Sequence, residues 1–146
     1  MKVDFNNIGI GALAIGSVLN IKTEFSLAKA TLILPFITHT ECLYYLARAT
    51  TQANSIEKLI AERTSYISNF NARYYDSLCL AFSSIQYLTE MGYAQHQGDL
   101  LLKIKPLEYN PKMGTRAKKI FQAANNISAL LSENEKKLFL NLRVEL

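Results

Sequence analysis

Residues 71–104 read "NARYYDSLCLAFSSIQYLTEMGYAQHQGDLLLKI", and this stretch decides the fold. Apolar residues recur at helical spacing over roughly 72–91, and Gly92 then stands in the position of a helix C-cap. The predicted buried stripe of this helix is Leu78, Ala81, Phe82, Ile85 and Leu88. Two short strand-like segments follow, and they flank the turn-forming sequence Gln-Gly-Asp at 97–99. A helix that leads into a small hairpin is the outline of a winged helix.

Apolar spacing predicts further helices on both sides of this stretch. Upstream, Asn54 and Glu57 form a capping box that opens a helix over about 56–70. Downstream, prolines and Gly114 predict an irregular connector, and a helix follows over about 115–131. Ser132 and Glu135 form a second capping box for a short last helix.

The most apolar part of the chain is the run over residues 25–49. It predicts a helix up to about Leu34, a break at Pro35 and then a second helix capped by Thr38 or Thr40. A proline inside so apolar a run predicts a buried elbow.

The length of 146 residues favours one domain with a sizeable core. We therefore predict a mainly helical, winged-helix-like single domain with a small β-hairpin and extra helices at both ends. Its parts are apolar N-terminal helices over 1–50, a helix-helix-wing centre over 55–104, and a basic connector with C-terminal helices over 105–146.

Three glycines in the stretch "NNIGIGALAIGSVLN", residues 6–20, raise the question of a phosphate-binding loop. A P-loop would continue with lysine after Gly16, where this chain has Ser17, and a dinucleotide fingerprint would need glycine at Ala14. Apolar residues surround the segment on all sides, as in a helix that is buried all round. Glycines in such a helix indicate close approach of another backbone, and alanine at Gly11 or Gly16 is expected to be tolerated.

Residues with catalytic or metal-binding chemistry are scattered along the chain. His39 and His96 are the only histidines, and neither has cysteine or carboxylate neighbours at metal-ligand spacing. Cys42 and Cys79 lack CxxC spacing, and no signal peptide or membrane-length apolar run is present. We expect a cytoplasmic protein that is not an enzyme, with no catalytic residues, cofactor, metal ion, small-molecule substrate or membrane contact.

Positive charge is concentrated in the last third of the chain. Residues 1–102 have a net charge of −1, whereas residues 103–146 have +5. A basic run there is a candidate patch for nucleic acid or an acidic partner; its members are Lys112, Arg116, Lys118 and Lys119. By contrast, the outer face of the predicted helix 72–91 has the single cation Arg73 against Asp76 and Glu90, which suits protein better than DNA.

The composition, 49% hydrophobic and 19% charged, is apolar for a domain that covers its own surface in water. Some apolar surface is therefore expected to contact a partner. The first apolar helix and the last helix are the best candidates, through Ile10, Leu13, Ile15, Val18, Leu138, Phe139 and Leu142.

Four segments together resemble a known family. They are "FNNIGIGALAIGSVLN" at 5–20, "LILPFITHTECL" at 32–43, "NARYYDSLCLAFSSIQYLTEMGY" at 71–93 and "LFLNLRVEL" at 138–146. Their order resembles the small middle component of bacterial three-component ABC conflict systems, of which the small subunit of the Lamassu anti-phage system is an example. Residues 39–45, "HTECLYY", depart from the basic, proline-bearing pattern of that family.

The resemblance implies a non-catalytic, winged-helix-like adaptor. Its implied partners are an SMC-like ABC ATPase that senses DNA and an effector, often a nuclease, with DNA contacted through the complex. The alternative function is a free-standing winged-helix transcriptional regulator that binds DNA with its basic tail.

Overall fold

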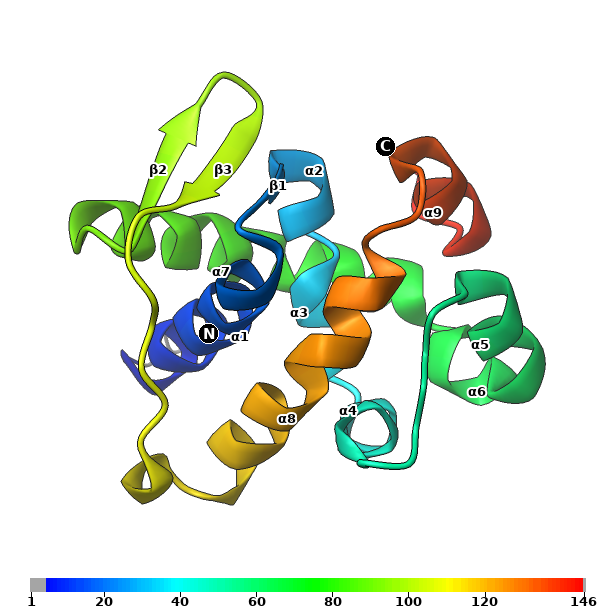
Figure 1. Ribbon diagram of the computed structural model, residues 1–146. Coiled ribbons are helices and arrows are strands. Elements are labelled where there is room, and N and C mark those ends of the chain that lie inside the picture. Colours follow the sequence, from blue (N-terminus) through cyan, green and yellow to red (C-terminus); the bar gives the residue numbers. More distant parts are fainter. Residues whose placement is uncertain (1–4, 146) are drawn as a thin grey trace.

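Helix α1 (Phe5–Lys22) lies in the middle of the molecule and packs against both α7 (Phe70–Glu90) and α8 (Thr115–Leu130) (Figure 1). The computed structural model describes residues 5–145. In chain order the elements are α1 (Phe5–Lys22), β1 (Glu24–Ser26), α2 (Leu27–Ala30), α3 (Ile33–Ile37), α4 (Thr40–Ala47), α5 (Ile56–Glu62), α6 (Thr64–Ile67), α7 (Phe70–Glu90), β2 (Ala94–Gln97), β3 (Leu100–Lys103), the 3₁₀ helix η1 (Pro111–Met113), α8 (Thr115–Leu130) and α9 (Glu135–Asn141). The predicted fold class, mainly helical with a small antiparallel sheet, is confirmed.

The core surrounds α1, which packs against α8, α7 and α3. Ile15 and Val18 are fully buried, and the apolar run predicted to be core is buried throughout residues 30–37. Because a helix covered on several sides needs no polar face, the absence of amphipathic spacing in α1 is explained by its central position.

The predicted hairpin is present as β2 and β3, with Gly98 at a φ of 62° in the turn. A third strand that the sequence did not predict, β1, pairs antiparallel with β3, so the sheet order is β1-β3-β2. Phe25 of β1 lies opposite Leu101 of β3, and both side chains are buried. The order helix, strand, helices, long helix and hairpin is compatible with a winged helix.

The predicted break at Pro35 is wrong by three residues. The chain turns at Thr31 and Leu32, between α2 and α3, and Pro35 lies inside the first turn of α3. Backbone N–H groups in a first turn have no intrahelical acceptor, so a proline there removes no hydrogen bond.

Three helix caps differ from their predictions by one or two residues. Ser55, Asn134 and His39 cap α5, α9 and α4 respectively, each through a side-chain acceptor for a backbone N–H. For His39 that acceptor is Nδ1, which lies 3.1 Å from the nitrogen of Cys42. Histidine is an uncommon N-cap, so the threonines beside it were the better sequence-based choice.

The helix predicted over 56–70 is divided into α5 and α6 by Arg63, whose φ and ψ are −138° and 56°. Arg63 has no glycine or proline neighbour. No glycine or proline therefore marks this break in the sequence.

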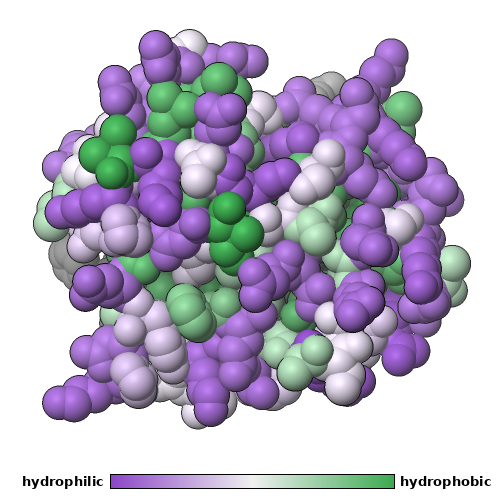
Figure 2. All heavy atoms as spheres, in the orientation of Figure 1, coloured by the Kyte–Doolittle hydropathy of each residue, from purple (hydrophilic) through white to green (hydrophobic). Residues whose placement is uncertain are grey.

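The face of the molecule seen in Figure 2 is mostly hydrophilic, with apolar residues in separate small patches. Among residues 5–145, no helix is both long and apolar enough to cross a membrane.

Candidate docking site

Helix α7 buries one side against α1 and α3 and leaves the other side exposed. Its buried residues are Phe70, Tyr74, Ser77, Ala81, Ser84, Ile85 and Leu88. Phe82, which the sequence analysis placed in the buried stripe, is instead 51% exposed. The helix is rotated so that small residues, Ser77, Ala81 and Ser84, face the interior.

The contact between α1 and α7 explains this rotation. Gly11 of α1 lies against Ser84, so close that a Cβ atom at Gly11 would stand 2.1 Å from the Ser84 Oγ atom. Only small residues permit two helices to approach to this distance. Gly11 therefore accommodates a close neighbour, as predicted, but the neighbour is the Ser84 side chain of the chain's own α7 and not another backbone.

The second glycine of α1, Gly16, accommodates the connector that follows the hairpin. A Cβ atom there would stand 2.6 Å from Cδ2 of Leu107. One turn further on, Asn20 exchanges two hydrogen bonds with the backbone of Leu107, at 2.8 and 2.9 Å. The glycine-rich segment is therefore a packing helix and has no phosphate loop.

Large apolar side chains are exposed at several positions around α7, and two of them, Tyr75 and Phe82, lie seven residues apart and so share one side of the helix. Tyr75 is 47% exposed, and Tyr87 and Met91, in and just after α7, are 41% and 51% exposed. With Phe82, they make up four of the eleven large hydrophobic residues that are exposed among the described residues. Single exposed apolar residues are ordinary, but several on one helix indicate a contact surface.

Four of the exposed residues follow each other at helical spacing. They are Tyr75, Cys79, Phe82 and Gln86, which we call the outer seam. Their separations of 4, 3 and 4 residues are those of the a and d positions of a heptad, which place side chains on one line facing a second helix.

The exposed charges of α7 beside the outer seam are negative. Asp76 and Glu90 are exposed, and Glu90 accepts a hydrogen bond from Gln86 at 3.0 Å. The one cation of α7, Arg73, points inward, where its Nε and Nη2 atoms donate to the carbonyl oxygens of Pro35 and Tyr66 at 3.0 and 2.6 Å. Partial burial there lowers the pKa of the Arg73 guanidinium.

A groove runs along one edge of this face, between α7, α3 and the N-terminal half of α1. It encloses about 450 Å³, and its lining includes Leu34, Ile37, Ile10, Asp76 and Cys79. Arg116, at the start of α8, also contributes to it. The groove and the outer seam share Cys79, so they form one continuous surface.

Comparison with known proteins identifies the family of the chain. Residues 16–146 match a protein family described as "ABC-three component (ABC-3C) system Middle Component 3". The chain belongs to this family. No curated protein and no solved structure matches it.

A middle component is one member of a multi-component ABC system, so other components are implied as partners. This agrees with the family that the sequence resemblance indicated. The matched range contains α7, the hairpin and everything that follows, whereas most of α1 precedes it.

The predicted partner contacts in α1 lie mainly inside this chain's own core. Leu13, Ile15 and Val18 are buried, and Ile10 is half-buried at the groove. Their apolar character is explained by the packing of α1 against α7 and α8. Partner contact through them remains a prediction, and among the four only Ile10 offers partly exposed surface for it.

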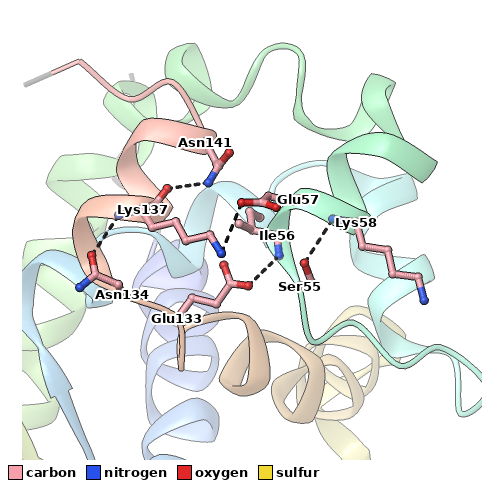
Figure 3. Close-up of polar contacts among 8 residues, drawn as sticks. All are labelled: Ser55, Ile56, Glu57, Lys58, Glu133, Asn134, Lys137 and Asn141. Atoms are coloured by element: carbon pink, nitrogen blue, oxygen red, sulfur yellow. Dashed lines mark hydrogen bonds and ion pairs between the residues drawn. The ribbon is translucent and has the colours of Figure 1, made fainter.

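Helix α9, the second predicted contact, also packs on the chain itself. Leu138 and Leu142 are buried, and the ring of Phe139 meets the edge of Tyr74 with centroids 6.1 Å apart. Figure 3 shows the polar side of this junction, where Glu133 Oε1 accepts from the nitrogen of Ile56 at 3.3 Å. Leu140, which is 69% exposed, is the apolar residue that α9 leaves free.

The predicted basic patch is divided between two settings. Lys112, Arg116 and Lys118 are exposed on η1 and the first turn of α8. Lys119 is half-buried, and its Nζ atom lies 5.3 Å from the ring centroid of Tyr44. Three of the four cations thus face solvent, and one of them, Arg116, also lines the groove.

The cysteine and histidine residues considered as nucleophiles or metal ligands are either buried, engaged in helix capping or exposed alone. Burial raises the pKa of Cys42 to about 12, which keeps its thiol protonated. His39 caps α4 and packs beside the ring of Tyr66, while His96 is exposed in β2. No group of three potential ligands is present among residues 5–145.

Sequence reasoning missed the outer seam because Phe82 fits a buried stripe equally well. The heptad spacing of residues 75, 79, 82 and 86 was the available signal. This spacing could be recognised only once it was known which apolar residues of the helix lie outside the core.

Proposed function

We propose that this middle component is a non-catalytic adaptor in an anti-phage or anti-plasmid defence complex. In this proposal it joins an SMC-like ABC ATPase, which senses DNA, to a nuclease-type effector whose activation it controls. The assembly would resemble the Lamassu system, in which a small subunit stands beside such an ATPase.

The observation that carries the proposal is the exposed apolar surface of α7 in a chain whose family implies partner components. A surface of this kind is suited to protein contact, because covering it removes apolar area from water. The core residues of α1 and α9 hold the domain together beneath it.

Co-expression with the ABC and effector components encoded beside this chain tests the adaptor role. We expect a co-purifying assembly in which omission of the middle component separates ATPase from effector. An ATPase and effector that bind each other equally well without it would contradict bridging. Calorimetry on the isolated chain should show no ATP binding, and measurable affinity would contradict the non-catalytic role.

A second candidate is a DNA-binding regulator, favoured by the winged-helix-compatible order of elements and by the exposed cations at 112–118. Titration of the isolated chain with duplex DNA separates the two candidates. Tight, sequence-specific binding would favour the regulator, whereas the acidic outer side of α7 leads us to expect none.

A further inference from the structure

We infer that the outer seam of α7 is the docking surface for one helix of another component, apolar along its contact line and basic along its flanks. This inference rests on the proposed adaptor function and names the surface that performs it. The spacing of the outer seam, its chemistry, and the charge beside it each specify part of this partner.

The spacing specifies a helix. Tyr75, Cys79, Phe82 and Gln86 occupy consecutive a and d positions over about three turns of α7. A partner helix lying at a shallow angle places its own side chains between these residues. Aromatic residues in the centre of such a contact are the usual energetic anchors, and Phe82 fills that place, with Tyr75 at the N-terminal end of the outer seam.

The surrounding charge specifies a basic partner. Asp76 and Glu90 border the outer seam on the same flank, and Arg73 is engaged with backbone carbonyls on the inner side. Glu90 also stands in the last turn of α7, where the helix dipole is already negative and no basic residue balances it. Lysine or arginine on the docking helix would supply that missing positive charge.

The same charges disfavour the other possible occupants. DNA would place phosphates against Asp76 and Glu90, with no outward cation in α7 to neutralise them. A second copy of this chain would bring the same acidic flank to both sides of a symmetric interface. A basic helix from another component would bring no negative charge against Asp76 and Glu90.

Cys79 provides a direct probe because it lies in the middle of the outer seam and its thiol is exposed. The assembly co-purified with the ABC and effector components is treated with a maleimide, and the labelling rate is compared with that of the isolated chain. We expect at least a tenfold slower reaction of Cys79 in the assembly. As a matched control, Ser65→Cys places an exposed thiol on α6, where we expect no protection.

Substitutions test the partner's chemistry. Phe82→Ala and the pair Asp76→Lys and Glu90→Lys should each weaken assembly tenfold or more, with the charge variant losing more at low salt than at high salt. Ile104→Ala and Glu62→Lys change an apolar residue of similar exposure, 54%, and an exposed acidic residue elsewhere, and should leave assembly unchanged. Circular dichroism of each isolated variant confirms that α7 is intact.

The outcomes separate this inference from the adaptor role. An assembly that forms while Cys79 is labelled at its free rate, or that tolerates all three α7 substitutions, overturns the α7 site and leaves the adaptor standing. Protection of Cys79 by duplex DNA, or by concentration-dependent dimers of the isolated chain, overturns it in favour of those occupants. Failure of any assembly to form overturns both proposals.

Discussion

At the residue scale, the contact between Gly11 and Ser84 sets the distance between α1 and α7. The Ser84 Oγ atom is buried without a hydrogen-bond partner in the described structure, and it faces the Gly11 Cα atom, which carries no side chain. The sequence alone led us to expect that alanine at Gly11 would be tolerated. The structure argues against that expectation, because a Cβ atom would meet both the Oγ and, at 3.1 Å, the Cβ of Ser84 unless Ser84 shifts.

We predict that Gly11→Ala lowers the free energy of unfolding by ~1–3 kcal/mol through overpacking. Ser84→Ala removes an unpaired buried hydroxyl and should be neutral or stabilising by ~1 kcal/mol. Combined, the two changes should cost less than their sum, because the closest contact is gone. Gly9→Ala is the control, since a Cβ atom there has open space and should stabilise α1 by up to ~1 kcal/mol. Strictly additive effects in urea denaturation would contradict this packing.

The two cysteines should differ sharply in reactivity. Cys79 is exposed, whereas Cys42 is buried and its pKa is raised to about 12. Because the thiolate is the nucleophile, we expect one thiol per folded chain to react with a disulfide reagent at pH 8, and Cys79→Ser to abolish that reaction. The second thiol should react only after denaturation. Rapid reaction of two thiols in the native protein would show that α4 opens easily.

At the element scale, two polar contacts connect α5 with α9 and with the turn just before it, and they contribute unequally to stability. Lys137 and Glu57 form an ion pair at 3.3 Å, but their side chains are 46% and 61% exposed. Glu133, half-buried, instead accepts from the nitrogen of Ile56 and so satisfies the N-terminal end of α5 (Figure 3). A buried backbone donor left without an acceptor costs more than a solvent-screened ion pair.

Accordingly, Glu133→Ala should destabilise the protein by ~1–2 kcal/mol, and Lys137→Ala by at most ~0.5 kcal/mol. Urea denaturation of the two variants measures the difference, and 1 M salt should erase only the Lys137 effect. The opposite ranking would mean that the ion pair, rather than the helix cap, holds α9 in place.

Elements with a strong periodic or turn signal could be predicted, and those defined by long-range pairing could not. The hairpin and the long helix α7 follow from local spacing and from Gly98. Strand β1 is three residues long and forms because it pairs with the edge of β3, whose residues lie 74 to 78 positions later in the chain. Likewise, α5 ends at Arg63 without a glycine or proline to mark the place.

At the scale of the whole molecule, the sequence predicted the helical class but did not show which apolar residues the chain's own core uses. Leu13 and Leu138 are apolar because this chain's own core needs them. Phe82 is apolar without such a need, and composition cannot distinguish the two cases. The rotation of α7 about its axis, which places Ser84 against Gly11 of α1, decides which of its faces remains outside.

The basic residues at the start of α8 also lack an explanation within the chain itself. Arg116 and Lys118 lie in the first turn, where the helix dipole is positive and no acidic residue is present. Cations there are unfavourable for the isolated helix, so an anionic partner, either nucleic acid or an acidic protein surface, would account for them.

We therefore predict that the double change Arg116→Glu and Lys118→Glu stabilises the isolated protein by ~0.3–1 kcal/mol per residue while weakening its binding to anions. Thermal unfolding measures the first effect, and duplex DNA titrated into the complete assembly over a range of salt concentrations measures the second. Lys112→Glu is the control, because Lys112 lies outside α8: its reversal should weaken anion binding about as much as one of the two α8 reversals but leave the melting temperature unchanged. A shallower salt slope for DNA would identify nucleic acid as the partner, whereas loss of assembly with unchanged DNA binding would identify an acidic protein surface. If the double variant is more stable and both binding measurements stay at the level of the unmodified chain, the cations have no anionic partner, and their unfavourable position at the start of α8 is left without compensation.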